Sequence, residues 1–118
     1  MPSLRETLSD LTKVEGINTA VVVGRDGFVI DGVSNGAGMD IEAVGAVIST
    51  GIGTAEIMGR ELQVGAMSQG MVEYLNGIIV MGFLGKDAVL ACVADSNCNL
   101  GNVRYQIKKR SPEIQASL

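Results

Sequence analysis

The spacing of apolar residues alternates along the chain between the period of a helix and that of a strand. Between residues 40 and 62, apolar side chains recur at steps of three, four and seven, which predicts one long helix. Helical spacing also covers residues 4–14 and 100–110. Ser3 and Asn99 have the short polar side chains that cap helix starts. The pattern therefore predicts three helices.

Five further segments have the composition of strands. They are residues 19–24, 28–33, 71–75, 78–84 and 88–94, with residues 63–68 leading into the third. Asp26–Gly27 and Asn76–Gly77 are strong hairpin signals, and Gly85–Asp87 forms another tight turn. Tight turns make the strands that they join antiparallel. The last two segments are apolar almost throughout, which indicates strands covered on both faces.

The order of elements is helix, two strands, helix, three strands and helix, which predicts an α/β fold of the α+β type. Strands covered on both faces need helices on both sides of one sheet. We therefore expect a three-layer α/β/α sandwich around a five-stranded, mainly antiparallel sheet. A length of 118 residues suits a single domain, residues 1–118. Pro112 is expected to end the last helix at Ser111 and to leave residues 113–118 as a loose tail.

The long helix contains four glycines where a helix does not favour them. They are Gly45, Gly51, Gly53 and Gly59. Each interior glycine costs about 1 kcal/mol relative to alanine, so a close contact with another surface is expected to offset the cost. A second apolar set on this helix has no evident partner within the chain: Val47, Thr54, Ile57 and Met58. This pattern predicts that the helix lies in the middle of an assembly.

Composition and charge exclude several classes of partner. The chain is 47% hydrophobic and 19% charged, which is typical of a globular domain, and its net charge of −4 argues against nucleic acid. The short basic run Lys108–Arg110 is expected to complement the dipole at the end of the last helix. No apolar run approaches the roughly 20 residues of a membrane span. We expect a cytoplasmic protein without direct membrane insertion.

The residues of the chain also argue against an enzyme. The absence of histidine removes the Ser-His-Asp and Cys-His catalytic sets. Cys92 lies in an apolar strand and is expected to be a small buried hydrophobe, while Cys98 lacks a base. Residues 95–99 begin like a calcium loop but depart from it at the sixth and twelfth positions. We therefore expect no catalytic residue, no metal and no cofactor.

One loop leaves a small-ligand alternative open. The segment Ser34–Gly38 precedes the start of the long helix, where backbone N–H groups can bind an anion. A sensor of small ligands is thus a further, weaker hypothesis. The glycines at residues 51–53 do not form a phosphate loop, because they lie inside a helix and no Gly-Lys-Ser/Thr follows.

The order of elements and two segments together resemble the roadblock domain family. The first segment is the hairpin VVVGRDGFVIDG after the first helix. The second resembles the family's Asn-x-Gly-x-x-Arg step into the third helix and contains Asn99, Gly101 and Arg104. The resemblance extends from Leu4 to Arg110. This family includes dynein light chains and bacterial and archaeal regulators of Ras-like GTPases, and its fold is of the roadblock/profilin-like type.

The resemblance implies a homodimer in which the third strands pair across a two-fold axis. The central helices would then lie side by side on one face, and the first and third helices would cover the other. The expected interface residues are Val47, Gly51, Thr54, Ile57, Met58, Met71 and Glu73. Gly70 lies in the expected edge strand, where glycine weakens pairing.

The function implied by the resemblance is regulation without catalysis. A homodimer of this kind would bind a small Ras-like GTPase and modulate its nucleotide cycle or localisation. The alternative is a structural adaptor of a larger motor or signalling complex without a GTPase. The domain is expected to supply no arginine finger, although Arg25 and Arg60 are the arginines that a test should address.

Overall fold

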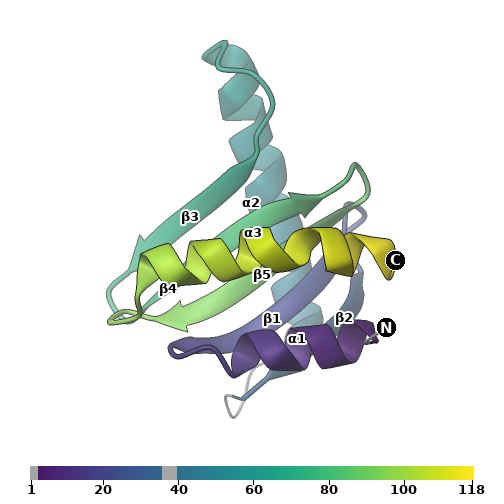
Figure 1. Ribbon diagram of the computed structural model, residues 1–118. Helices are drawn as coiled ribbons and strands as arrows, with labels where there is room; N and C mark the ends of the chain where they lie inside the picture. Colours follow the sequence, from purple (N-terminus) through teal and green to yellow (C-terminus); the bar gives the residue numbers. More distant parts are fainter. Residues whose placement is uncertain (1–2, 36–39) are drawn as a thin grey trace.

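The computed structural model describes residues 3–35 and 40–118. Three helices and five strands follow one another in the predicted order (Figure 1). They are α1 (Leu4–Thr12), β1 (Ile17–Gly24), β2 (Val29–Ser34), α2 (Ile41–Glu61), β3 (Gln69–Tyr74), β4 (Gly77–Leu84), β5 (Ala88–Asp95) and α3 (Leu100–Ala116).

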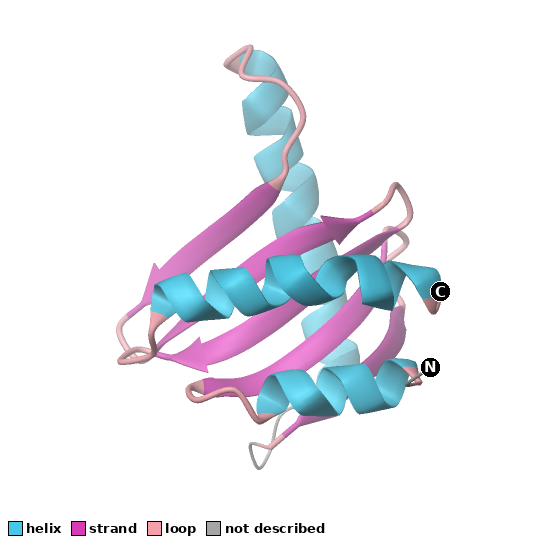
Figure 2. Cartoon of the chain, in the orientation of Figure 1, coloured by secondary structure: helices cyan, strands magenta, loops and turns pink. Residues whose placement is uncertain are grey.

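The five strands form one sheet in the spatial order β2-β1-β5-β4-β3, with every neighbouring pair antiparallel. β5 lies at the centre, although it is the last strand of the sequence. Helices α1 and α3 cover one face of the sheet and α2 lies on the other, as Figure 2 shows. The predicted three-layer sandwich is confirmed.

Alternation along the strands divides the core between the two faces. Val22 and Leu90 point toward α1 and α3, where they join Leu8 and Ile107 in the larger cluster. The smaller cluster under α2 contains Val21, Val23, Ile48, Ile52, Met81, Val89 and Ala91. The central strands are therefore buried on both faces, as their continuous apolar sequence predicts.

Short polar side chains cap all three helices. The Asp40 carboxylate accepts backbone N–H groups from Glu42 and Ala43 at 3.1 and 3.4 Å. The Asn99 side chain accepts the N–H of Asn102 at 3.0 Å, and Ser3 caps α1 in the same way. These bonds satisfy donors that a helix start otherwise leaves unpaired.

The predicted end of the last helix is wrong. α3 continues through Pro112 to Ala116, so residues 113–116 are helical rather than a loose tail. Ile114 is fully buried in the cluster beneath α1 and α3, and the Glu113 carboxylate accepts a hydrogen bond from Thr7 at 3.3 Å. Packing of this last turn offsets the roughly 3 kcal/mol that an interior proline costs.

β3 begins two residues before the predicted segment 71–75 and ends at Tyr74, while residues 63–68, which the sequence left as a possible lead-in to the strand, form a turn and an irregular segment. Gly70 does not disturb the strand, since β3 pairs with β4 in continuous register from Gln69 to Tyr74. A Cβ atom at Gly70 would lie 2.5 Å from the Met67 methyl group. The glycine therefore leaves room for Met67 on the α2 face.

Candidate functional site

Helix α2 is much longer than the surface that it covers. Figure 1 shows that its C-terminal half extends past the edge of the sheet. Of its 21 residues only Gly45, Ile48 and Ile52 are buried. A few further residues, such as Ile41 and Val44, are partly covered, and about half of the helix is exposed.

The exposed side of α2 carries a regular seam. Its members follow at steps of four, three, four, three and four residues, and all are exposed: Ala43, Val47, Thr50, Thr54, Ile57 and Glu61. These steps average 3.6 residues, the period of the α-helix, so the six side chains form one continuous stripe along which another helix can pack. Met58 flanks the seam with 57% of its surface exposed. We refer to these seven residues as the α2 seam.

The hydroxyl groups in the seam are already satisfied within the helix. Thr50 donates to the carbonyl of Ala46 at 3.0 Å, and Thr54 donates to the carbonyl of Thr50 at 3.1 Å. Neither hydroxyl needs water or a partner to pair its hydrogen. The middle of the seam is therefore suited to an apolar contact.

The four glycines of α2 have two different uses. A Cβ at Gly45 would lie 2.6 Å from Val29 Cγ2, and one at Gly59 would lie 3.1 Å from the Gly65 carbonyl oxygen. These two glycines allow close packing within the chain, so the interpretation that all four face another surface is wrong. A Cβ at Gly51 or Gly53 would meet nothing within 4 Å.

The two edges of the sheet differ in how they are protected. Edge strand β2 has a register shift against β1, and its Asp31 pairs with Arg5 of α1. Edge strand β3 keeps continuous register and exposes Met71, Val72 and Tyr74. Charges and irregularities block pairing at an edge, whereas a regular apolar edge favours it. β3 is therefore the edge suited to a further strand.

The side chains of β3 alternate between the two faces. Gly70 faces the α2 side, where its Cβ would meet Met67 and Met81, so Val72 and Tyr74 lie on that side too. Met71 and Glu73 lie on the α3 side. All seven predicted interface residues are exposed. Sequence reasoning missed Val72 and Tyr74, although their alternation with Gly70 was the available signal.

The two arginines singled out from the sequence have different surroundings. Arg25 forms an ion pair with Glu56, and its guanidinium lies 5.3 Å from the centre of the Phe83 ring. Arg60 makes no ion pair with the described residues. Both line a hollow of about 990 Å³ beside α2. Arg60 is thus the arginine that is available to a partner there.

The Asn-x-Gly-x-x-Arg residues lie at the start of α3. Asn99 caps the helix and Gly101 is exposed in its first turn. The Arg104 Nε donates to Gln69 Oε1 at 3.0 Å, which links α3 to β3. The structure therefore places the three residues on one helix end, where two of them have structural contacts.

A comparison with known protein families agrees with the observed fold. The model of the Roadblock/LC7 domain matches residues 4–94. The chain belongs to the Roadblock/LC7 domain family. The resemblance found in the sequence is confirmed, and the match ends before Asn99.

Relatives of this Roadblock/LC7 domain include proteins of Methanocaldococcus jannaschii. "Uncharacterized protein MJ0310" is 37% identical over 109 residues, which is 92% of this chain and 94% of that protein. "Uncharacterized protein MJ0714" is 33% identical over 109 residues, covering 92% of this chain and 91% of that protein.

Solved structures share the fold at low sequence identity. MglB of Myxococcus xanthus matches with a TM-score of 0.88 and 19% identity, covering 96% of this chain and 92% of that one. A Roadblock/LC7 domain from Streptomyces avermitilis gives a TM-score of 0.87 at 19% identity, covering 98% and 97%. Another similar structure is described as MglB with a tetrameric arrangement, with a TM-score of 0.89, 15% identity and coverage of 97% and 86%.

The chemically reactive groups of this Roadblock/LC7 domain are few. Burial raises the pKa of the Cys92 thiol from 9.0 to about 12, so the thiol is neutral at physiological pH. Within residues 3–35 and 40–118, no three His, Cys, Asp or Glu side chains gather where a metal could bind. Of the loop proposed to bind an anion, Ser34 and Asn35 are described, and residues 36–38 lie outside the described residues.

Helix α2 is also long and apolar enough to cross a membrane, judged by length and composition alone. The core helices of globular domains pass the same test. Here Ile48 and Ile52 pack on the sheet, and Glu56 forms an ion pair with Arg25 of the β1–β2 turn. The helix is therefore an integral layer of the Roadblock/LC7 fold.

Proposed function

We propose that this protein is a cytoplasmic, non-enzymatic homodimer that binds a small Ras-like GTPase and modulates its nucleotide cycle or localisation. The observation that carries the proposal is the exposed α2 seam together with the unprotected edge of β3. Membership of the Roadblock/LC7 family supports it, because the family includes regulators of Ras-like GTPases.

Contact with a second copy of the chain is more favourable for the α2 seam than exposure to water. Val47, Ile57 and Met58 are each more than half exposed, at 67%, 51% and 57%. Fully burying a side chain of this kind contributes about 1.5–3 kcal/mol. Two seams related by a two-fold axis would bury six such side chains, a substantial driving force for association.

The small residues of the seam lie near its middle. Thr50 and Thr54 of the seam, with Gly51 next to them in the helix, are close to the midpoint between Ala43 and Glu61. In an antiparallel pair of α2 helices they would meet their own copies, where small side chains allow interaxial distances near 8 Å. The same two-fold axis would bring the two β3 edges together and extend the sheet.

The dimer is tested by placing a charge in the seam. We expect Ile57→Asp to convert the protein from a dimer to a monomer in size-exclusion chromatography with light scattering, because a carboxylate cannot be buried there unpaired. Ile30→Asp on the opposite edge strand is the matched control, since Ile30 and Ile57 are 50% and 51% exposed. A dimer that tolerates Ile57→Asp as well as Ile30→Asp would contradict this interface.

The GTPase partner is tested with the small Ras-like GTPases encoded in the same genome. Each is loaded with fluorescent GDP or GTP analogues, and its binding, nucleotide exchange and hydrolysis are measured with and without the purified domain. We expect binding by one of them, with a change in exchange, in hydrolysis or in localisation only. Absence of binding to all of them would remove the GTPase proposal and leave the adaptor.

A variant of Arg60 distinguishes regulation through binding alone from catalysis by an arginine finger that the domain supplies. A finger contributes about 10³–10⁵-fold to hydrolysis. We expect Arg60→Ala to change the GTPase rate by less than about tenfold, because the proposed domain acts without catalytic residues of its own. A loss of several hundredfold, with dimerisation and GTPase binding intact, would show that Arg60 acts as a finger.

A further inference from the structure

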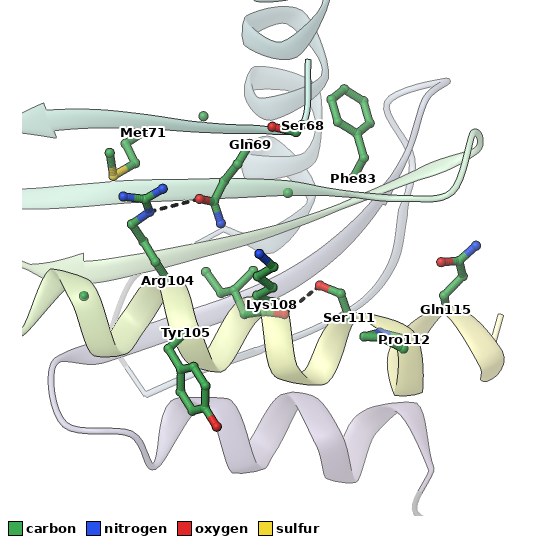
Figure 3. A pocket seen from close by; sticks show the side chains of 14 residues that line it. Ser68, Gln69, Met71, Phe83, Arg104, Tyr105, Lys108, Ser111, Pro112 and Gln115 are labelled. Atoms are coloured by element: carbon green, nitrogen blue, oxygen red, sulfur yellow. Dashed lines mark hydrogen bonds between the residues drawn. The ribbon is translucent and has the colours of Figure 1, made fainter. Parts of the chain in front are cut away.

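A groove lies on the side of the sheet opposite to α2. It runs between α3 and edge strand β3 and has a volume of about 770 Å³ (Figure 3). It exists because α3 packs on β4 and leaves the neighbouring face of β3 uncovered. We refer to it as the α3–β3 groove.

One wall of the groove is a polar stripe of α3. Its members follow at steps of four, three and four residues: Arg104, Lys108, Ser111 and Gln115. Figure 3 shows Arg104 reaching from α3 toward Gln69 and Met71 of β3. Among the described residues Arg104 is engaged through its Nε alone, which donates to Gln69 Oε1 at 3.0 Å. Its two terminal guanidinium nitrogens remain available to a ligand.

The basic residues of α3 are not explained by the helix dipole. Because α3 continues to Ala116, the run Lys108–Arg110 lies in the body of the helix and no basic residue occupies its last turn. The dipole effect falls off within the last turn, so the expectation from the sequence is wrong. Another reason for the cations is needed.

Charge on this part of the molecule is unbalanced. Residues 104–110 carry four cations and no carboxylate, in a chain with a net charge of −4. Among the described residues, Arg110 reaches Asp10 at 4.0 Å, whereas Arg104 and Lys108 have no carboxylate partner. Two like charges one turn apart repel each other, and an anionic ligand between them would remove that repulsion.

The floor of the groove is apolar. Ile107 is buried there, Gly82 contributes no side chain, and Met71 is 45% exposed at the β3 side. A phosphate backbone has no group that would fill such a floor, whereas a peptide has both carboxylates and apolar side chains. The combination therefore favours a peptide.

The length of the groove sets the length of the ligand. Gly101 and Gln115 mark its ends along α3, and 14 helical steps span about 21 Å. An extended chain advances about 3.3 Å per residue, so about six residues fit. We propose that the α3–β3 groove binds an extended acidic segment of a partner protein, with carboxylates on Arg104 and Lys108 and an apolar side chain against Met71 and Ile107.

This interaction is independent of the proposed GTPase partner. The groove lies on the face away from the α2 seam, and of the residues that line it only Met71 also belongs to the expected dimer interface. A dimer formed through α2 and β3 would carry two such grooves, and a monomer would retain one. Failure of the GTPase assays therefore leaves the acidic-segment proposal standing, and the reverse also holds.

The test begins with a random eight-residue peptide library displayed on phage and selected on the full-length protein. We expect the selected peptides to be enriched in Asp and Glu around one apolar position. A fluorescein-labelled peptide of the selected sequence then gives a dissociation constant by fluorescence anisotropy. Selection without acidic enrichment would overturn the proposal.

Adjacent lysines provide a matched pair of variants. Lys108→Glu reverses a charge that lines the groove, whereas Lys109→Glu makes the same change one residue away, outside the lining residues. We expect at least tenfold weaker peptide binding for Lys108→Glu and a change below about twofold for Lys109→Glu. Both lysines are exposed, so both variants are expected to fold. Equal losses in the two variants would overturn the proposal by showing non-specific attraction.

Two further probes address other anions. Single-stranded oligouridine and vesicles containing phosphatidylserine are tested with the same variants. We expect neither to bind with a dependence on Lys108, because the net negative charge of the chain repels extended polyanions. Lys108-dependent binding of either probe, without binding of any acidic peptide, would overturn the proposal.

Discussion

At the scale of single residues, the environment of Cys92 is the one that the sequence predicts best. It lies in the middle of β5, pairs across the sheet with Ala20 and Val80, and is fully buried. Its apolar neighbours in the sequence were enough to predict this, because a continuous apolar strand must be covered on both faces. Burial in turn disfavours the thiolate, which explains the raised pKa.

The raised pKa of Cys92 predicts a loss of stability at alkaline pH. Between pH 9 and 12 the unfolded chain releases this thiol proton and the folded chain keeps it, so stability falls as pH rises through this range and is unaffected below it. Between pH 8 and 10 the loss from this group is about 1.4 kcal/mol. Urea unfolding of wild type and Cys92→Ala at both pH values measures it. An equal change in the two proteins would contradict the assignment.

The glycines of α2 give a second prediction at this scale. A Cβ at Gly45 would lie 2.6 Å from Val29 Cγ2 and 3.0 Å from the Gly27 carbonyl oxygen. We expect Gly45→Ala to lower the free energy of unfolding by about 1–3 kcal/mol, the usual cost of overpacking. Gly51→Ala is the control for the fold, because its Cβ would meet none of the described residues within 4 Å. Chemical denaturation that finds no loss for Gly45→Ala would contradict the close contact.

At the scale of elements, local rules predicted where helices begin better than where they end. The caps at Asp40 and Asn99 depend only on neighbouring backbone, so they could be found from the sequence. The end of α3 depends on contacts with residues about 100 positions away, such as the bond from Thr7 to Glu113. A rule based on Pro112 alone cannot include them.

The misplaced end of α3 also explains why the α3–β3 groove was missed. With the helix ending at Ser111, the basic run appeared to lie in a last turn, where the dipole accounts for it. The α2 seam was found because it follows from spacing within one helix. The contribution of Val72 and Tyr74 beside it needed the faces of β3, which the contacts of Gly70 reveal.

The last turn of α3 can be tested by shortening one side chain. Ile114 is fully buried in the larger core cluster, so we expect Ile114→Ala to lower the free energy of unfolding by about 2–5 kcal/mol. Leu118→Ala is the comparison, since Leu118 is 51% exposed at the end of the chain. Its expected effect is within about 0.5 kcal/mol. Equally small losses of stability for the two variants, in thermal or urea unfolding, would show that residues 113–118 are a loose tail.

At the scale of the whole molecule, the two faces of the sheet have different tasks in this proposal. The α1 and α3 face holds the larger core cluster and keeps the protomer folded. The α2 face holds a smaller cluster and leaves about half of its helix exposed. Stability of the α2 layer would then depend on the partner copy, while the α3–β3 groove stays open on the other side.

This dependence predicts that stability rises with protein concentration. If folding is coupled to dimer formation, each tenfold increase in protein concentration stabilises the folded dimer by about 1.4 kcal per mole of dimer. The midpoint of thermal unfolding therefore rises with concentration. Calorimetric or circular dichroism melts over a hundredfold range of concentration measure the shift. In Ile57→Asp the midpoint should be lower and independent of concentration, while Ile30→Asp should keep the concentration dependence because Ile30 lies on the protected edge. A wild-type midpoint that does not move would mean that the α2 layer is stable without a second copy.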